Sequence, residues 1–308
     1  MAADAPEPDC GVSEQIALQF AKAKKHHTGI ALKGIEALEL RYKGYTGKEI
    51  AALYHTSPKS VFSWISRAKQ KLRQNGELEA LLAEARQLAD SGVKELIVIA
   101  QDITRYGMDL EEPSSLARLL KELCKLDFHW IRLHYLYPEV ITDELIDTIA
   151  REKKIVHYLD IPIQHCNDNI LKAMRRRNTK AEIRALFAKL RAAMPDVVIR
   201  TSLICGLPGE GEEEFEELCA FLREEKIQRA GVFQFSPEEG TLAAAMEDQV
   251  DGEVAARRVE LVVDLQSRIM DEYNEARLGT VMEVLCEGFD AQAGCFAGRT
   301  YADSVDID

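Results

Sequence analysis

The feature that most constrains the fold is a fivefold alternation of helical and extended patterns that begins near residue 78. Short apolar runs alternate with longer stretches whose apolar residues recur every three to four positions. This order is typical of parallel strands joined by crossover helices. The predicted strands cover residues 95–100, 130–135, 156–161, 197–204 and 229–235, and the predicted helices cover residues 78–90, 116–126, 143–152, 180–194 and 211–224. The sequence therefore predicts an α/β fold with a parallel sheet, closed or partly closed as a barrel.

Polar residues follow every one of these predicted strands. Any single one could be a turn residue or a hydrogen-bonded buried group, but parallel barrels place their working face at the carboxyl ends of the strands. All five strands together favour an active-site rim. The residues concerned are Gln101, Asp102, His134, Tyr135, Gln164, His165, Gly206 to Glu210, Ser236 and Glu238.

The fourth strand ends in a turn rich in glycine, with Gly206, Pro208, Gly209 and Gly211. Glycine lets the backbone turn sharply and lets amide groups approach a small molecule. The acidic run 210–214 then begins a helix, where the helix dipole favours negative charge. Two interpretations stay open at this point, a ligand-binding loop and an ordinary connection between strand and helix.

Charge is unevenly distributed along the chain. Residues 1–75 carry 12 Lys and Arg against 7 Asp and Glu, although the whole chain has a net charge of −13. A basic head joined to an acidic body is typical of a nucleic-acid-binding segment attached to a domain that would repel nucleic acid.

The basic head has the pattern of a helix-turn-helix. Thr46 and Glu49 form a capping box before one short helix, and Ser57 with Pro58 can begin a second helix that runs to about residue 73. The apolar positions of the second helix recur at helical spacing, and basic residues line its other faces. A generic helical hairpin with a solvated basic face is the alternative.

The stretch LRYKGYTGKEIAALYHTSPKSVFSWISRAKQKLR resembles region 4 of sigma factors, with a likeness that covers about residues 30–75. In that family, residues early in the second helix face the major groove of DNA. The resemblance implies that Lys59, Ser60 and Ser63 face the bases, and that Arg67 and Lys71 lie near phosphates.

The cysteines and the apolar runs exclude several classes of protein. The seven cysteines include no CxxC or CxxxCxxC pattern, so the sequence predicts no metal site. No apolar run approaches the length of about 20 residues that a bilayer requires. The amino terminus lacks the order of a signal peptide. We expect a cytoplasmic protein without membrane contact.

Five segments of the body resemble the radical SAM methylthiotransferases, most closely the RimO type. They are AQDITRYG (100–107), WIRLHYLYPEVITDELID (130–147), YLDIPIQHCNDNILKAMRR (158–176), RTSLICGLPGEGEEEF (200–215) and FSPEEGT (235–241). The resemblance implies an incomplete, open, TIM-like radical SAM barrel. It also implies a transferase that adds a methylthio group to an aspartate of a small-subunit ribosomal protein, using S-adenosylmethionine and [4Fe-4S] clusters.

The resemblance further implies the residues that bind the cofactor. Gln101 and Asp102 are expected near the methionine end of S-adenosylmethionine, and Gln164 and Arg176 near its ribose and carboxylate. Gly206, Pro208, Gly209 and Glu210 are expected beside the adenosine. Residues 279–308 resemble the start of a TRAM β-barrel that is cut short. We expect three domains, with the head at 1–75, the partial barrel at 76–278 and the TRAM segment at 279–308.

The sequence departs from this family where the cluster should be. The family holds its [4Fe-4S] cluster with a CxxxCxxC loop after the first barrel strand, and here the helix-turn-helix stands in place of that strand and loop. Only Cys166 and Cys205 lie near the expected rim, and two thiols are too few. We therefore name no catalytic residue and expect an inactive fragment or chimera. The alternatives are a DNA-binding regulator that uses the barrel remnant as a sensor or dimerisation unit, and a module that docks the ribosomal protein without modifying it.

Overall fold

The computed structural model describes residues 20–21, 24–25, 29–43, 45–108 and 115–305, and only the backbone at residues 31, 42 and 66–77. The chain divides into two compact units. The first comprises Met1–Arg86 with Gly107–Ser114, and the second comprises Gln87–Tyr106 with Ser115–Asp308.

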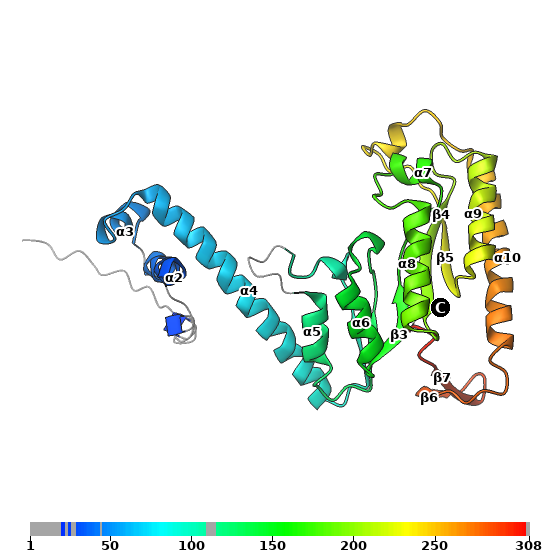
Figure 1. Ribbon diagram of the computed structural model, residues 1–308, viewed down its shortest axis with the longest axis horizontal. Coiled ribbons are helices and arrows are strands. Elements are labelled where there is room, and N and C mark those ends of the chain that lie inside the picture. Colours follow the sequence, from blue (N-terminus) through cyan, green and yellow to red (C-terminus); the bar gives the residue numbers. More distant parts are fainter. Residues whose placement is uncertain (1–19, 22–23, 26–28, 44, 109–114, 306–308) are drawn as a thin grey trace, which may run out of the picture. The chain divides into compact units, whose positions relative to one another are not determined.

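The first unit contains α2 (Gly29–Tyr42), α3 (Gly47–Leu53) and the beginning of α4 (Pro58–Asp90). The predicted capping box is confirmed, since Thr46 accepts a hydrogen bond from the Glu49 amide and the Glu49 carboxylate accepts one from the Thr46 amide. The buried residues shared by these helices are Ala37, Ile50, Ala51 and Val61. Two short helices and a longer one around a common core form the predicted helix-turn-helix (Figure 1).

The prediction of two separate helices at 58–73 and 78–90 is wrong. Helix α4 continues over 33 residues from Pro58 to Asp90. Asn75 and Gly76 are poor helix formers, and glycine costs about 1 kcal/mol relative to alanine in a helix. The surrounding Lys, Leu, Arg, Gln and Glu residues are good helix formers, and they offset this cost.

The second unit contains a five-stranded sheet in the order β1-β2-β3-β4-β5. All four neighbouring pairs are parallel, so the predicted α/β class is confirmed. Since β1 and β5 lie at the two ends of this order, the sheet is open. The strands are β1 (Glu95–Val98), β2 (Trp130–Leu133), β3 (Ile155–Asp160), β4 (Val198–Cys205) and β5 (Arg229–Gln234).

Helices connect the strands as predicted and follow one another along the sheet (Figure 1). Several begin with a side-chain cap, for example Ser115, Thr142 and Thr179. Within the second unit, the helices α7 and α10 were not predicted. The helices are α5 (Leu116–Leu123), α6 (Asp143–Arg151), α7 (Asp168–Ala173), α8 (Lys180–Ala193), α9 (Glu212–Glu225) and α10 (Gly252–Glu275), with short 3-10 helices at Ile103–Arg105, Pro138–Val140 and Ala243–Ala245.

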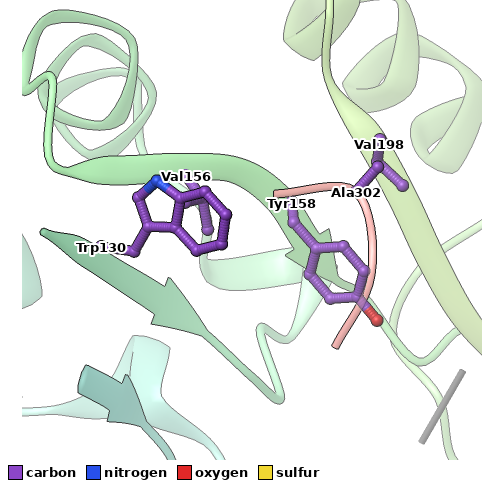
Figure 2. Close-up of a cluster of buried hydrophobic side chains, with 5 residues drawn as sticks. All are labelled: Trp130, Val156, Tyr158, Val198 and Ala302. Carbon is purple, nitrogen blue, oxygen red and sulfur yellow. The ribbon is translucent and has the colours of Figure 1, made fainter. Parts of the chain in front are cut away.

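After α10 the chain forms an antiparallel hairpin of β6 (Leu285–Asp290) and β7 (Cys295–Arg299). The strand character expected for this segment is therefore confirmed. Residues 300–304 follow the hairpin and return to the sheet, where Ala302 packs against Trp130, Val156, Tyr158 and Val198 (Figure 2). Among the described residues, no helix combines the length and the apolarity that a bilayer crossing would demand.

Candidate functional site

Three neighbouring strands are each followed by a residue in the left-handed backbone region. Tyr135 follows β2 with φ 58°, Gln164 follows β3 with φ 62°, and Gly206 follows β4 with φ 82°. A non-glycine residue in this region costs roughly 1–2 kcal/mol, and such strain clusters at functional sites. The three turns give the carboxyl edge of the sheet the sharply folded rim that the sequence predicted.

Below this rim lies a buried polar group made by β2, β3 and β4. Asp160 is fully buried, and its carboxylate accepts hydrogen bonds from the Arg200 guanidinium at 2.9 Å and from the Tyr135 amide at 3.2 Å. The His134 ring lies 3.6 Å from the same carboxylate. Burial alone would raise the pKa of Asp160, but His134 and Arg200 outweigh it and hold that pKa below its ordinary value. The carboxylate is therefore charged and fixes the Tyr135 turn.

Gln164 joins the third strand end to the fourth. Its backbone amide donates a hydrogen bond to Ser202 O, and its backbone carbonyl accepts one from the Ile204 amide, both at 2.9 Å. The side-chain oxygen Oε1 is buried and has no hydrogen-bond partner among the described residues. A buried acceptor without a partner is unfavourable, and a bound ligand or water satisfies such a group. The orphaned oxygen is the observation that most directly supports a ligand at this rim.

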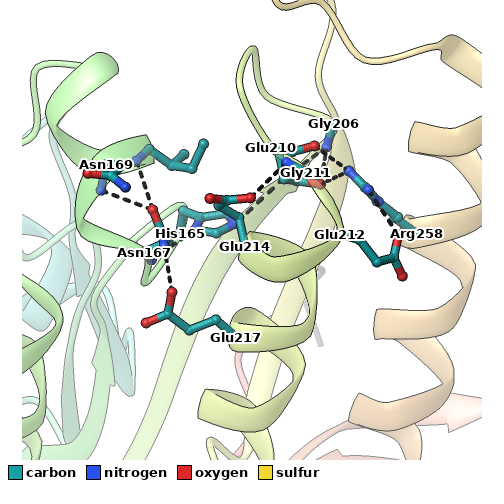
Figure 3. A network of polar contacts seen from close by, with 11 residues as sticks. His165, Asn167, Asn169, Gly206, Glu210, Gly211, Glu212, Glu214, Glu217 and Arg258 are labelled. Atoms are coloured by element: carbon teal, nitrogen blue, oxygen red, sulfur yellow. Dashed lines mark hydrogen bonds and ion pairs between the residues drawn. The ribbon is translucent and has the colours of Figure 1, made fainter.

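The glycine turn is closed by a buried carboxylate (Figure 3). Both oxygens of Glu210 lie 3.0 Å from the Gly206 amide, and Arg258 of α10 donates to Glu210 Oε1 at 3.0 Å and to Glu210 O at 2.7 Å. Glu210 is 3% exposed. Burial raises its pKa, and the Gly206 amide and Arg258 oppose that rise. Glu210 thus holds the turn together within the fold.

His165 stands beside this turn as a neutral ring. Its Nδ1 accepts a hydrogen bond from the Asn167 amide at 3.0 Å, which requires an unprotonated nitrogen, and its Nε2 lies 3.6 Å from Glu210. Burial lowers the pKa of His165 to about 4; Glu217 opposes this shift and Arg258 adds to it. The ring therefore stays neutral at physiological pH and serves the structure of the turn.

Two further cofactor-binding residues of the prediction, Asp102 and Arg176, have structural partners. Asp102 caps a 3-10 helix by accepting from the Thr104 amide at 3.0 Å, and it pairs with Arg105 at 2.7 Å. Arg176 donates to Pro162 O at 2.9 Å and stacks 4.9 Å from the Tyr137 ring. Gln101 is exposed.

The loops that carry these residues are connected at several points. The Ile103 amide donates to Tyr135 O at 3.2 Å and so ties the first strand end to the second. In the fourth loop, Gly209 donates to Asp248 O at 2.7 Å. Ser236 and Glu238, after β5, are exposed. The strand ends β1 to β4 thus form one linked rim, and the Gln164 oxygen is one of its buried polar atoms without a partner among the described residues.

Sequence reasoning missed the buried partners Asp160, Arg200 and Arg258. Asp160 and Arg200 lie inside predicted strands, where a charged residue within an apolar run was the available signal. Arg258 lies on α10, which was not predicted. Each of these residues positions a strand-end turn through contacts with residues 25–48 positions away.

The thiols do not fit an iron–sulfur cluster. Burial raises the pKa of both Cys166 and Cys205 to about 12, and two thiols are fewer than the three that such a cluster needs. In the part of the chain that the structure describes, no group of three or more His, Cys, Asp and Glu side chains is arranged to hold a metal ion.

In the first unit, Lys59 is exposed on the first turn of α4, and Ser63 is half-buried. The Ser60 hydroxyl bonds to that of Ser57 at 2.9 Å, so it serves the helix start. The side chains of Arg67 and Lys71 lie outside those described.

A parallel sheet whose strands end in a linked polar rim defines an α/β domain of the partial-barrel type. The profile of the radical SAM superfamily matches residues 58–222, and the chain belongs to this superfamily. The profile of sigma-70 region 4 matches residues 36–72.

Two curated relatives are ribosomal protein uS12 methylthiotransferases RimO. The relative from Caldanaerobacter subterraneus is 45% identical over 243 residues, covering 79% of this chain and 54% of the relative. The relative from Lachnoclostridium phytofermentans is 48% identical over 232 residues, which cover 75% of this chain and 53% of the relative. The chain spans about half the length of these relatives. Among solved structures, coproporphyrinogen III oxidase from Escherichia coli is 18% identical with a TM-score of 0.46, covering 64% of this chain and 46% of that one.

Proposed function

We propose that the second unit binds S-adenosylmethionine at the rim formed by the ends of β1 to β4, as a partial methylthiotransferase of the RimO type. The relatives are named for action on ribosomal protein uS12, so the proposed protein partner is this small-subunit ribosomal protein. The observation that carries the proposal is the buried Gln164 oxygen without a partner, at the rim where the family resemblance expects the cofactor.

The chemistry of the rim supports this ligand. The Gln164 side-chain amide and Arg176 would hold its polar groups, while Glu210 keeps the adjoining turn in shape through the Gly206 amide and Arg258. The cofactor, when bound, supplies a sulfonium that can be cleaved. The residues present do not fit the [4Fe-4S] cluster that the family also uses, so we propose binding without turnover in this chain.

Replacing Gln164 with asparagine tests the proposed site. Asparagine tolerates the left-handed backbone and withdraws the amide oxygen by one methylene. We expect affinity for S-adenosylmethionine, measured by isothermal titration calorimetry, to fall about tenfold, equivalent to one lost hydrogen bond. The matched control Gln87→Asn changes an exposed glutamine of α4 and should leave binding unchanged. The proposal is wrong if the parent chain does not bind, or if both variants bind equally well.

We also propose that the first unit binds duplex DNA, because it has helix-turn-helix geometry and matches sigma-70 region 4. This reading makes the chain a regulator with the barrel as an attached sensor or dimerisation domain. Lys59, with Ser63 on the same helix, would approach the groove, and Arg67 and Lys71 would approach the phosphates. The Ser57 hydroxyl accepts a hydrogen bond from the Ser60 amide at 3.1 Å and so caps the start of α4.

Salt dependence tests DNA binding. We expect duplex affinity, measured by fluorescence anisotropy, to fall steeply with salt, and Lys71→Ala, at a proposed phosphate contact, to reduce the logarithmic salt slope by about one. As the control, Lys121→Ala removes an exposed lysine of α5 and should leave the salt slope unchanged. Absent or salt-independent binding would remove this second function and leave the first untouched.

A further inference from the structure

Residues 300–304, here called the strap, lie across the face of the sheet that carries Trp130, Tyr158 and Val198 (Figure 2). Ala302 is 2% exposed and Ser304 is 3% exposed, and the other three residues of the strap are partly buried. The strap follows the exposed β6–β7 hairpin and has no helical or strand structure of its own. Its position is therefore set by side-chain contacts with the sheet.

Those contacts are mostly polar and reach strands at both sides of the sheet. Arg132 of β2 donates to Tyr301 O at 2.8 Å, and Arg229 of β5 pairs with Asp303 at 2.6 Å. The Ser304 hydroxyl lies 3.0 Å from His134 Nε2. Five residues thus span the face from β5 to the end of β2.

The part of the sheet beneath the strap, here called the seat, contains the arginines Arg132 and Arg229, of which Arg132 also pairs with Glu95 at 2.7 Å. Arg229 is 8% exposed, and among the described residues Asp303 is the one carboxylate within ion-pair distance of it. Arg229 Nε and Nη1 and Arg132 Nη2 are buried donors without a hydrogen-bond partner in the described part of the chain. The seat therefore offers more donors than the strap uses.

A segment held in this way can be displaced. The favourable energy of a buried ion pair is largely cancelled by the desolvation of its charges, and the apolar contacts of the strap are those of Ala302 and of the partly buried Tyr301. Local segments with few apolar contacts open well below the free energy of global unfolding.

We propose that the strap is a displaceable gate over this face of the sheet, closed by the Asp303–Arg229 pair. When the gate is closed, it covers Val198 and Tyr158 and ends at His134, directly beneath the Tyr135 turn of the candidate rim. When the gate is open, the interior of the sheet is continuous with that rim. The proposal concerns the strap alone and does not depend on which ligand the rim binds.

Thiol labelling tests the gate. Val198→Cys places a thiol under Ala302, and Cys205, on the same strand but on the opposite face, is buried and reports unfolding of the whole unit. In full-length protein treated with iodoacetamide, we expect Cys at position 198 to react about tenfold faster when Asp303→Asn is added, because the ion pair that closes the gate is lost. Asp264→Asn is the matched control, since Asp264 lies on the exposed side of α10 and pairs with Arg268.

A second measurement needs no charge variant. Raising sodium chloride from about 0.05 to 1 M screens the partly exposed Asp303 and should accelerate labelling at position 198 several-fold without accelerating Cys205. The proposal is overturned if the thiol at position 198 is labelled at the same rate in the Asp303→Asn and the Asp264→Asn variants. It is also overturned if Cys205 reacts in step with position 198, because the opening is then global unfolding.

Discussion

Replacing Gly206 with alanine is expected to destabilise the second unit by about 3–5 kcal/mol, the sum of a backbone penalty and a collision. Gly206 has φ 82°, and a Cβ added there would lie 2.4 Å from the Cβ of Ala255 on α10. Neither group can move easily, because the Gly206 amide is held by Glu210 and Ala255 is 3% exposed. Urea unfolding followed by Trp130 fluorescence, in a Trp64→Phe background, measures the loss.

Gly209 provides a matched control for this variant. It has the same φ of 82°, but the nearest atom to an added Cβ is Ile170 Cδ1 at 3.9 Å. Gly209→Ala should therefore cost only the backbone penalty of about 1–2 kcal/mol. Adding Ala255→Gly to Gly206→Ala should recover part of the difference. If Gly206→Ala and Gly209→Ala are equally stable, the contact between the turn and α10 is not as close as described.

Arg258→Ala is the second large effect, expected at roughly 3–5 kcal/mol because it leaves a buried carboxylate unpaired. The Arg258 guanidinium donates to Glu210 twice and to Glu212 at 3.3 Å, and it packs 5.1 Å from the Phe215 ring. The same urea unfolding measures the change. Arg268→Ala, which removes an exposed arginine from the same helix, should change stability by less than about 0.5 kcal/mol.

A double variant separates charge from packing at this position. In Arg258→Ala with Glu210→Gln, the carboxylate that lost its partner becomes a neutral amide. We expect this double variant to be more stable than Arg258→Ala alone. If it is no more stable, the loss comes from packing against Phe215 and the unpaired charge contributes little.

The strands were predictable because each is a short apolar run bounded by polar or glycine residues. All five predicted strands agree with the structure to within two residues at each end. Helix α10 was missed because two of its five buried positions, Arg258 and Gln266, are polar, so its apolar periodicity is incomplete. Helix α7 is six residues long, too short for a periodic signal.

The sequence predicted which residues lie at the strand ends of the candidate site. It did not predict which of them contact one another. Sequence spacing placed Gln164 and Gly206 at the rim, since carboxyl ends of parallel strands meet at one edge. It gave no indication that Glu210 faces Arg258, which lies 48 positions away on a helix that was not predicted. The strap was missed for a similar reason, because its partners Arg132 and Arg229 are distant in sequence and its own residues are polar.

The left-handed residues at the strand ends have a consequence for the evolution of this fold. Glycine would relieve the backbone at Tyr135 and Gln164, yet both positions hold large polar side chains. Natural proteins keep such local costs where activity and stability favour different residues. Tyr135 and Gln164 therefore place a large polar side chain at the rim at the cost of a strained main chain.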